Sequence, residues 1–327
     1  EFLSSEAGEY SLVYTVTDQN GCRDSIEIPV VVNANPIITA TNDTSACQNS
    51  VVTLMPHVVP GSGEISGYLW TGENTGLLSN INTQNPEFIS NEPGAFYFDF
   101  SVIDENNCKD IEPVKVLVHD NPDVSFDPGE LEICAGSEIM IEPEVDFSGG
   151  EITSHNWNGI YSEYLSDTTM PSPVFSTENP GIYQFEYEVT DIHFCTDQSS
   201  VSITVNSLPK VSFSGLAPDY CMNDEEIELF GYPANGLFQG EGIQENTFDP
   251  DMAGPGSKQI IYSYTDINSC MGFDTATTYV HPLPDTRIIN LRQDYCVTPG
   301  GYIEFEASPA GGNFYLDGEL QGYINLD

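Results

Sequence analysis

Residues 181–195 decide the fold class; they read Gly-Ile-Tyr-Gln-Phe-Glu-Tyr-Glu-Val-Thr-Asp-Ile-His-Phe-Cys. Large apolar side chains occupy alternate positions in this stretch, at Tyr183, Phe185, Tyr187 and Val189. A period of two, built from aromatic and β-branched residues, predicts a strand with one buried face. The opening glycine lies two residues before Tyr183, which is where an immunoglobulin-like (Ig-like) sandwich turns into its sixth strand.

The same pattern returns along the chain at fixed offsets. In four segments a glycine is followed 14 residues later by a cysteine: Gly8 to Cys22, Gly94 to Cys108, Gly181 to Cys195 and Gly256 to Cys270. A proline follows each of these cysteines by 14 residues, and a second cysteine follows each proline by 11 or 12; these second cysteines are Cys47, Cys134, Cys221 and Cys296. Regular spacing of this kind predicts tandem structural repeats.

Other recurrent residues complete the expected sandwich. A phenylalanine precedes each sixth strand and predicts the anchor of strand E, at Phe2, Phe88, Phe175 and Phe248. Trp70, Trp157 and Phe238 fit the buried core aromatic of strand C. No stretch has helical periodicity. The sequence therefore predicts an all-β protein made of tandem immunoglobulin-like β-sandwich repeats.

Prolines mark the boundaries between the repeats, because proline fixes φ and holds the preceding residue extended. The predicted domains are a partial repeat over 1–35 (strands E to G), complete repeats over 36–121 and 122–208, a shorter repeat over 209–283 and a partial repeat over 284–327. Short proline-containing junctions favour an elongated, semi-rigid rod over a flexible string.

Composition narrows the function classes. The 327 residues hold 51 acidic against 7 basic side chains, a formal net charge of −44. Such a chain repels phosphate backbones and anionic membranes, which excludes nucleic acid as a partner. No apolar run reaches the roughly 18–20 residues that span a bilayer. An apolar content of 39% is enough to build cores.

The eight cysteines predict disulfides, because no Cys-x2-Cys pair or histidine spacing suits a metal. The upstream cysteine of each repeat is expected near strand B and the downstream one in the F–G turn, at opposite ends of one sandwich. We therefore favour the inter-repeat pairs Cys47–Cys195 and Cys134–Cys270, with Cys22, Cys108, Cys221 and Cys296 pairing elsewhere. Two alternatives stay open: pairs within a repeat (Cys47–Cys108, Cys134–Cys195, Cys221–Cys270) and pairs of sequence neighbours such as Cys22–Cys47 and Cys108–Cys134.

An aspartate lies four residues before each downstream cysteine, at Asp18, Asp104, Asp191 and Asp266. These carboxylates are calcium candidates, but bonding to the amides of their own turns is the favoured interpretation. Tyr68, Tyr161 and Tyr164 are candidates for stacking on sugars, with packing against the core favoured. No catalytic motif is present, and near-identical repeats argue against a unique active site, so no enzyme activity is expected. No cofactor is expected either, with calcium as the alternative.

The stretch from Asn121 to Cys195 carries the motifs Ile-Cys-x-Gly, Trp-x-Gly and Pro-Gly-x-Tyr-x-Phe-x-Tyr-x-Val-Thr-Asp. It resembles the Ig-like and PKD-like repeat modules of giant Bacteroidota surface adhesins, of the gliding-motility SprB type. The resemblance implies export by type IX secretion, an extracellular, outer-membrane-associated location, a motility partner, and O-glycosylation at Asp-[Ser/Thr]-apolar motifs. Candidate positions for this modification are Ser25, Thr168 and Thr275.

Three functions remain. The favoured one is a cell-surface adhesin segment that attaches to substrata or surface polysaccharide and contacts other repeats of the same chain. The alternatives are a purely structural stalk and the accessory repeat region of a secreted polysaccharide-degrading enzyme.

Overall fold

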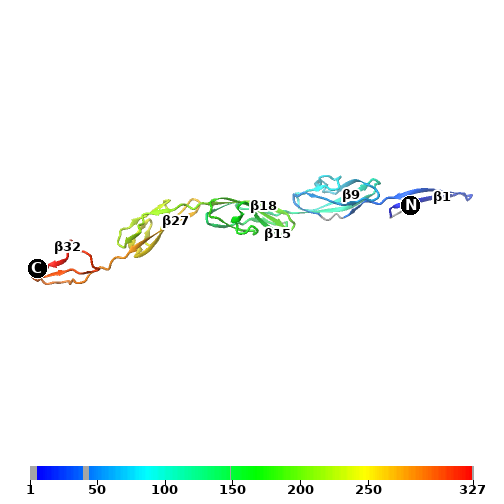
Figure 1. Cartoon of the computed structure of the whole chain (residues 1–327). Coiled ribbons are helices and arrows are strands. Elements are labelled where there is room, and N and C mark those ends of the chain that lie inside the picture. The colour runs from blue at the N-terminus through cyan, green and yellow to red at the C-terminus, as the bar shows by residue number, and fades with distance from the viewer. Residues whose placement is uncertain (1–5, 40–43, 148, 326–327) are drawn as a thin grey trace. The chain divides into compact units, whose positions relative to one another are not determined.

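The computed structural model describes residues 6–39, 44–147 and 149–325. The chain divides into two compact units, Glu1–Val205 and Asn206–Asp327 (Figure 1). Strands account for nearly all of its regular structure, and the helices of the described ranges are single turns: η1 (Thr75–Leu77), η2 (Ser162–Tyr164) and α1 (Pro250–Ala253). No helix in those ranges has the length and apolarity to cross a bilayer.

The stretch that opened the sequence analysis forms β17 (Gly181–Asp191), a central strand of the second sandwich. It lies in a four-stranded sheet of order β12-β18-β17-β15, where β12 is Glu130–Cys134, β18 is Thr196–Asn206 and β15 is Ile152–Asn158. The other layer contains two strand pairs: β11 (Asp123–Ser125) with β14 (Glu144–Asp146), and β13 (Glu138–Met140) with β16 (Val174–Ser176).

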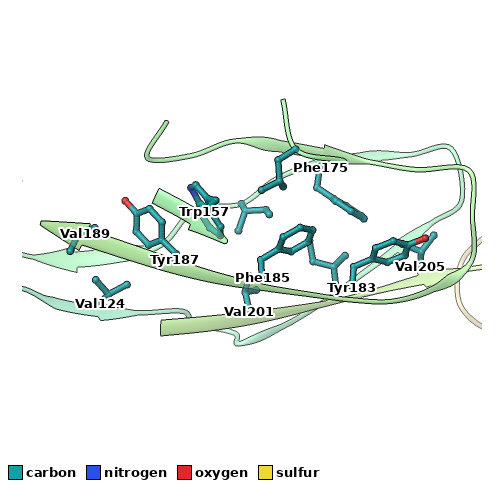
Figure 2. Close-up of a cluster of buried hydrophobic side chains, with 12 residues drawn as sticks. Val124, Trp157, Phe175, Tyr183, Phe185, Tyr187, Val189, Val201 and Val205 are labelled. Carbon is teal, nitrogen blue, oxygen red and sulfur yellow. The ribbon is translucent and has the colours of Figure 1, made fainter. Parts of the chain in front are cut away.

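The core of this second sandwich contains the alternating residues of β17. Tyr183, Phe185, Tyr187 and Val189 are buried, while Ile182, just before Tyr183, is 63% exposed, so the predicted half-buried strand is confirmed. Figure 2 shows Trp157 and Tyr187 beside each other in this cluster; their ring centroids lie 4.4 Å apart. Phe175 is fully buried among the same side chains.

The first sandwich repeats this arrangement 87 residues earlier. One sheet has the order β4-β10-β9-β7, with bounds Thr44–Cys47, Lys109–His119, Gly94–Asp104 and Ile65–Thr71. The other layer pairs β3 (Ile37–Thr39) with β6 (His57–Val59) and β5 (Val52–Thr53) with β8 (Glu87–Phe88). Trp70 takes the place of Trp157: its indole N–H donates to the Thr83 carbonyl over 2.8 Å, as that of Trp157 donates to Met170 over 2.9 Å.

The second unit holds a shorter sandwich. Its main sheet has the order β20-β27-β26-β23, with bounds Asp219–Cys221, Met271–His281, Gly256–Thr265 and Leu237–Gln239. The remaining strands are β19 (Ser212–Ser214), β22 (Phe230–Tyr232), β21 (Ile227–Glu228), β24 (Ile243–Gln244) and β25 (Thr247–Phe248). Phe238 replaces the tryptophan and packs 4.5 Å from Tyr262, centroid to centroid.

The ends of the chain hold smaller strand pairs. β1 (Gly8–Thr17) and β2 (Arg23–Val32) form an antiparallel hairpin equivalent to strands F and G; the expected strand-E anchor Phe2 lies outside the described residues. After 284 the pairs are β28 (Arg287–Ile288) with β30 (Ala307–Ser308), β29 (Tyr302–Glu304) with β33 (Tyr323–Asn325), and β31 (Phe314–Leu316) with β32 (Glu319–Gln321).

The predicted fold class, an all-β chain of Ig-like sandwiches, is therefore confirmed. Each of the three cores lies inside one of the ranges expected for a complete repeat: Ile38–Val118, Val124–Val205 and Tyr220–Val280. The three aromatic residues expected at the strand-C position, Trp70, Trp157 and Phe238, are all buried.

Candidate functional site

A disulfide joins the first sandwich to the second. Cys47 is the last residue of β4, and Cys195 lies in the turn between β17 and β18. Their Cα atoms are 5.5 Å apart although the cysteines are 148 residues apart in sequence. This is the inter-repeat pair favoured by the sequence.

The open alternatives that involve these two cysteines are wrong, and the strand register gives the reason. Cys47 pairs in the sheet register with His119, the last residue of β10, whereas Cys108 immediately precedes the first residue of the same strand. At about 3.3 Å per residue, an 11-residue strand separates Cys47 from Cys108 by roughly 36 Å, far beyond the ~7 Å that a disulfide allows between Cα atoms.

The other cysteines fall into two groups. Cys134 and Cys270 are also disulfide-bonded. The pair Cys134–Cys195 is excluded because Cys195 is bonded to Cys47, and the pair Cys221–Cys270 because Cys221 is a free thiol. The favoured pairing of Cys134 with Cys270 stays a prediction. Cys22, Cys108, Cys221 and Cys296 have free thiols, so the pairing of sequence neighbours is wrong as well.

The aspartate before each downstream cysteine organises the turn that carries it. Asp191 Oδ1 accepts hydrogen bonds from the amides of His193 and Cys195, both over 2.8 Å. Asp18, Asp104 and Asp266 accept from the equivalent amides two and four residues ahead. These bonds are those expected from the favoured interpretation of the four residues.

The calcium hypothesis for these aspartates stays a prediction. In the part of the chain that the structure describes, no three His, Cys, Asp or Glu side chains are grouped as metal ligands would be. Asp104 and Asp191 are nevertheless buried, each only 1% exposed, and their Oδ2 atoms have no hydrogen-bond partner.

Two imidazoles stack beside the disulfide. The rings of His119, from the first sandwich, and His193, from the second, lie 3.7 Å apart with planes 11° from parallel. Burial is the main cause that lowers the pKa of His119; His193 lowers it further, and the Asp191 carboxylate opposes both effects. His119 is therefore neutral at pH 7, which is the form that permits close stacking.

The remaining candidates from the sequence are scattered. Ser25 and Thr275 are exposed on β2 and β27, and Thr168 is half-buried before β16; O-glycosylation at these positions stays a prediction. Tyr68, Tyr161 and Tyr164 pack against the two cores, as the favoured interpretation expects. The structure does not bring these residues together into one site.

A cavity that the sequence analysis missed opens on the second sandwich. Its volume is about 600 Å³, and it lies between β14 and the start of β15. Apolar side chains form most of its wall: Pro143, Val145, Phe147, Ile152 and Pro171. The polar side chains are Glu151, His155, Ser172 and Tyr187.

The polar floor of the cavity is a hydrogen-bonded pair. His155 Nδ1 lies 2.7 Å from the Tyr187 hydroxyl, and the two rings are parallel within 6°. Burial raises the pKa of Tyr187 to about 12 and lowers the pKa of His155. Both groups are therefore neutral at pH 7, and the Tyr187 hydroxyl and His155 Nδ1 share one hydrogen bond.

The corresponding place in the first sandwich is filled. Tyr68 and Phe100 occupy the positions of His155 and Tyr187 and stack 6.0 Å apart. Gln84 occupies the position of Pro171, and its amide donates to the Pro56 carbonyl over 2.9 Å. Pro56 and Gly63 are buried, whereas their equivalents Pro143 and Gly150 are only half-buried.

Six lining positions differ between the two sandwiches, and three of them carry the contacts just described: His155 stands where the first sandwich has Tyr68, Tyr187 where it has Phe100, and Pro171 where it has Gln84. They are visible when the repeats are aligned at their period of 87. Their spacing gives no hint that they line one cavity.

The known proteins that resemble this chain share little of its sequence. No family model matches the chain. The pesticidal crystal protein Cry22Aa of Bacillus thuringiensis is 22% identical over 268 residues, which are 80% of this chain and 35% of that protein. The chain thus spans about a third of the length of this relative.

Similar solved structures are multidomain β proteins. The N-terminal eight Ig domains of Down Syndrome Cell Adhesion Molecule match with a TM-score of 0.39 and 11% identity, over 86% of this chain and 44% of that one. The fibronectin(III)-like modules of Clostridium thermocellum CbhA match with a TM-score of 0.28 and 13% identity, over 53% of this chain and 94% of that one.

Proposed function

We propose that this chain is the non-catalytic repeat region of an exported surface protein that attaches to substrata or polysaccharide. The observation that carries the proposal is the disulfide between Cys47 and Cys195. Disulfides of this kind form and persist in oxidising compartments, outside the cytosol. A bond between two sandwiches, in place of one within each, prevents neighbouring repeats from separating under load.

The charge of the chain suits a protein that works outside the cell. A formal net charge of −44 keeps a repetitive chain soluble and resists association between copies. It also disfavours anionic partners, so an uncharged or cationic surface is the expected one.

Absence of catalysis is part of the proposal. His155 and Tyr187 are hydrogen-bonded to each other, with 2.7 Å between Nδ1 and the hydroxyl oxygen. A tyrosine with a pKa of about 12 is a poor acid or base at neutral pH. No nucleophile with an adjacent base was identified in the sequence.

The finer assignment comes from the sequence resemblance. We propose the SprB type of surface adhesin, exported by type IX secretion, held at the outer membrane and coupled to gliding motility. Surface polysaccharide, other repeats of the same chain and the motility machinery are the proposed partners.

A purely structural stalk is the second candidate, because the same inter-sandwich disulfide suits a spacer that only transmits force. Beads coated with the full 327-residue chain distinguish the two functions. Attachment to polysaccharide-coated glass, blocked by soluble chain, supports the adhesin. Beads that bind no polysaccharide and no bare surface would contradict it and leave the stalk.

A further inference from the structure

The geometry points to the cavity of the second sandwich as a binding site for an amine-bearing pyranose, one or two rings of an amino-sugar polymer. The inference deepens the proposed function and rests on it, since it names the class of polysaccharide that the chain would hold. Volume, wall chemistry and charge each support it.

Volume sets the size of the occupant. At about 600 Å³ the cavity lies within the range of pockets that hold drug-sized ligands. One or two pyranose rings match this size, whereas a single lysine side chain would leave most of the cavity filled with water. The size therefore favours a ring-bearing ligand over an alkylammonium group from a protein partner.

The wall has two kinds of surface. Val145, Phe147 and Ile152 offer an apolar face, which suits the C–H face of a sugar ring. Ser172 and the imidazole of His155 offer hydrogen bonds to hydroxyls. A flat body with an apolar face and a polar rim fits this combination, because buried polar groups need partners and apolar walls do not.

The negative charge of the second sandwich favours a ligand that carries an amine. Residues 122–208 contain sixteen Asp and Glu and no Lys or Arg. Glu151 lies in the wall of the cavity and is exposed, so its carboxylate is available to a cationic group. A uronic acid would meet repulsion from the whole sandwich, and a neutral sugar would gain no charge-assisted hydrogen bond from Glu151.

The first sandwich supplies the matched negative control. Tyr68, Phe100 and Gln84 close the equivalent place without loss of the fold. The triple substitution His155→Tyr, Tyr187→Phe and Pro171→Gln copies this arrangement into the second sandwich. It should fill the cavity and preserve the core.

The test is titration calorimetry on the full chain with four probes: a glucosamine tetramer, an N-acetylglucosamine tetramer, a galacturonic acid tetramer and tetralysine. A Trp70→Phe background leaves Trp157 as the remaining tryptophan, and it packs on Tyr187, so its fluorescence reports occupancy. We expect the glucosamine tetramer to bind and to change this fluorescence, and the galacturonic acid tetramer to do neither.

The variants separate the cavity from general charge attraction. Glu151→Gln should weaken glucosamine binding roughly five- to tenfold, as expected for loss of a charge-assisted hydrogen bond, and the triple variant should abolish it. Glu163→Gln removes the same charge at an exposed position outside the cavity and should have no effect. Equal weakening by both glutamine variants, tetralysine binding as tight as that of the sugar, or a triple variant that still binds would each overturn the inference.

Failure of the inference and failure of the proposed function give different results. If the wild-type beads attach to polysaccharide and the triple variant attaches equally well, the cavity is not the site and the adhesin proposal stands. If the glucosamine tetramer binds in the cavity but beads attach to nothing, the site stands and the adhesin proposal fails.

Discussion

His119 and His193 stack face to face across two sandwiches, with ring centroids 3.7 Å apart. The contact lies beside the disulfide: His119 is paired with Cys47 in the sheet register, and His193 is two residues before Cys195. Asp191 holds this second turn in shape through the amides of both His193 and Cys195. The junction thus combines a covalent bond, an aromatic contact and a buried carboxylate.

Acidification should destabilise this junction through His119. Its pKa is lower in the folded chain than the ordinary 6.5, so the unfolded chain binds more protons once the pH falls below about 6.5. The stability that the neutral imidazole contributes is therefore present above this pH and is lost as the pH falls toward the lower folded pKa. Urea unfolding at pH 7.5 and 5.5 should show a larger loss for wild type than for His119→Gln.

The comparison between variants removes the effect of the many carboxylates, which titrate alike in both proteins. His57→Gln, an exposed histidine on β6, is the matched control and should keep the wild-type pH dependence. Parallel pH profiles for wild type and His119→Gln would contradict the prediction, because they would show that titration of His119 has no part in the pH dependence of stability.

Removing the disulfide should lower stability without changing the fold. Cys47→Ser opens a loop of 148 residues, and a loop of that length contributes up to about 5 kcal/mol on chain-entropy grounds. Urea unfolding followed by tryptophan fluorescence reports both sandwiches, because Trp70 lies in the first core and Trp157 in the second. Cys108→Ser, at a free thiol, is the control and should unfold as wild type does; a Cys47→Ser midpoint equal to it would contradict the prediction.

Much of the fold could be predicted because its signals are local. Alternation at Tyr183, Phe185, Tyr187 and Val189 needs nothing beyond the pleat of one strand. The pairing of Cys47 with Cys195 could also be predicted, since strand lengths alone place the two cysteines of one sandwich too far apart for a disulfide.

The cavity and the histidine stack could not be predicted, because they depend on residues that only the folded chain brings together. The cavity is lined from two strands and a loop, by His155, Tyr187 and Pro171. Considered alone, none of these three differences from the first sandwich predicts a cavity. His119 and His193 belong to different repeats. Their contact follows from the geometry of the junction, which no periodicity encodes.

The turn aspartate of the first sandwich should contribute to stability through its hydrogen bonds. Asp104→Ala leaves the amides of Asn106 and Cys108 without their acceptor, which should cost about 1–3 kcal/mol in a buried setting. Asp104→Asn keeps an Oδ1 acceptor and should cost less. Thermal unfolding of both variants, measured with and without millimolar calcium, separates the two roles considered for this residue.

Calcium should leave the melting temperature of the wild-type chain unchanged if Asp104 only organises its turn. A rise in that temperature, lost in Asp104→Asn, would contradict this prediction and support the calcium site. The equivalent change Asp18→Ala, at an exposed position, is the control and should have a smaller effect than Asp104→Ala.

A stretching force applied to the two ends of the chain should be carried by the disulfide and should bypass both sandwich cores. When the chain is pulled from its ends, tension runs from β3 to Cys47, across to Cys195 and on through β18, so the 148-residue stretch between the cysteines bears none of it. At about 3.3–3.6 Å per extended residue, the disulfide of the oxidised chain prevents the extension of up to about 500 Å of polypeptide. Single-molecule pulling should release this length only after reduction, and not in oxidised Cys108→Ser; an oxidised wild-type chain that extends as far as the reduced one would show that the bond carries no load.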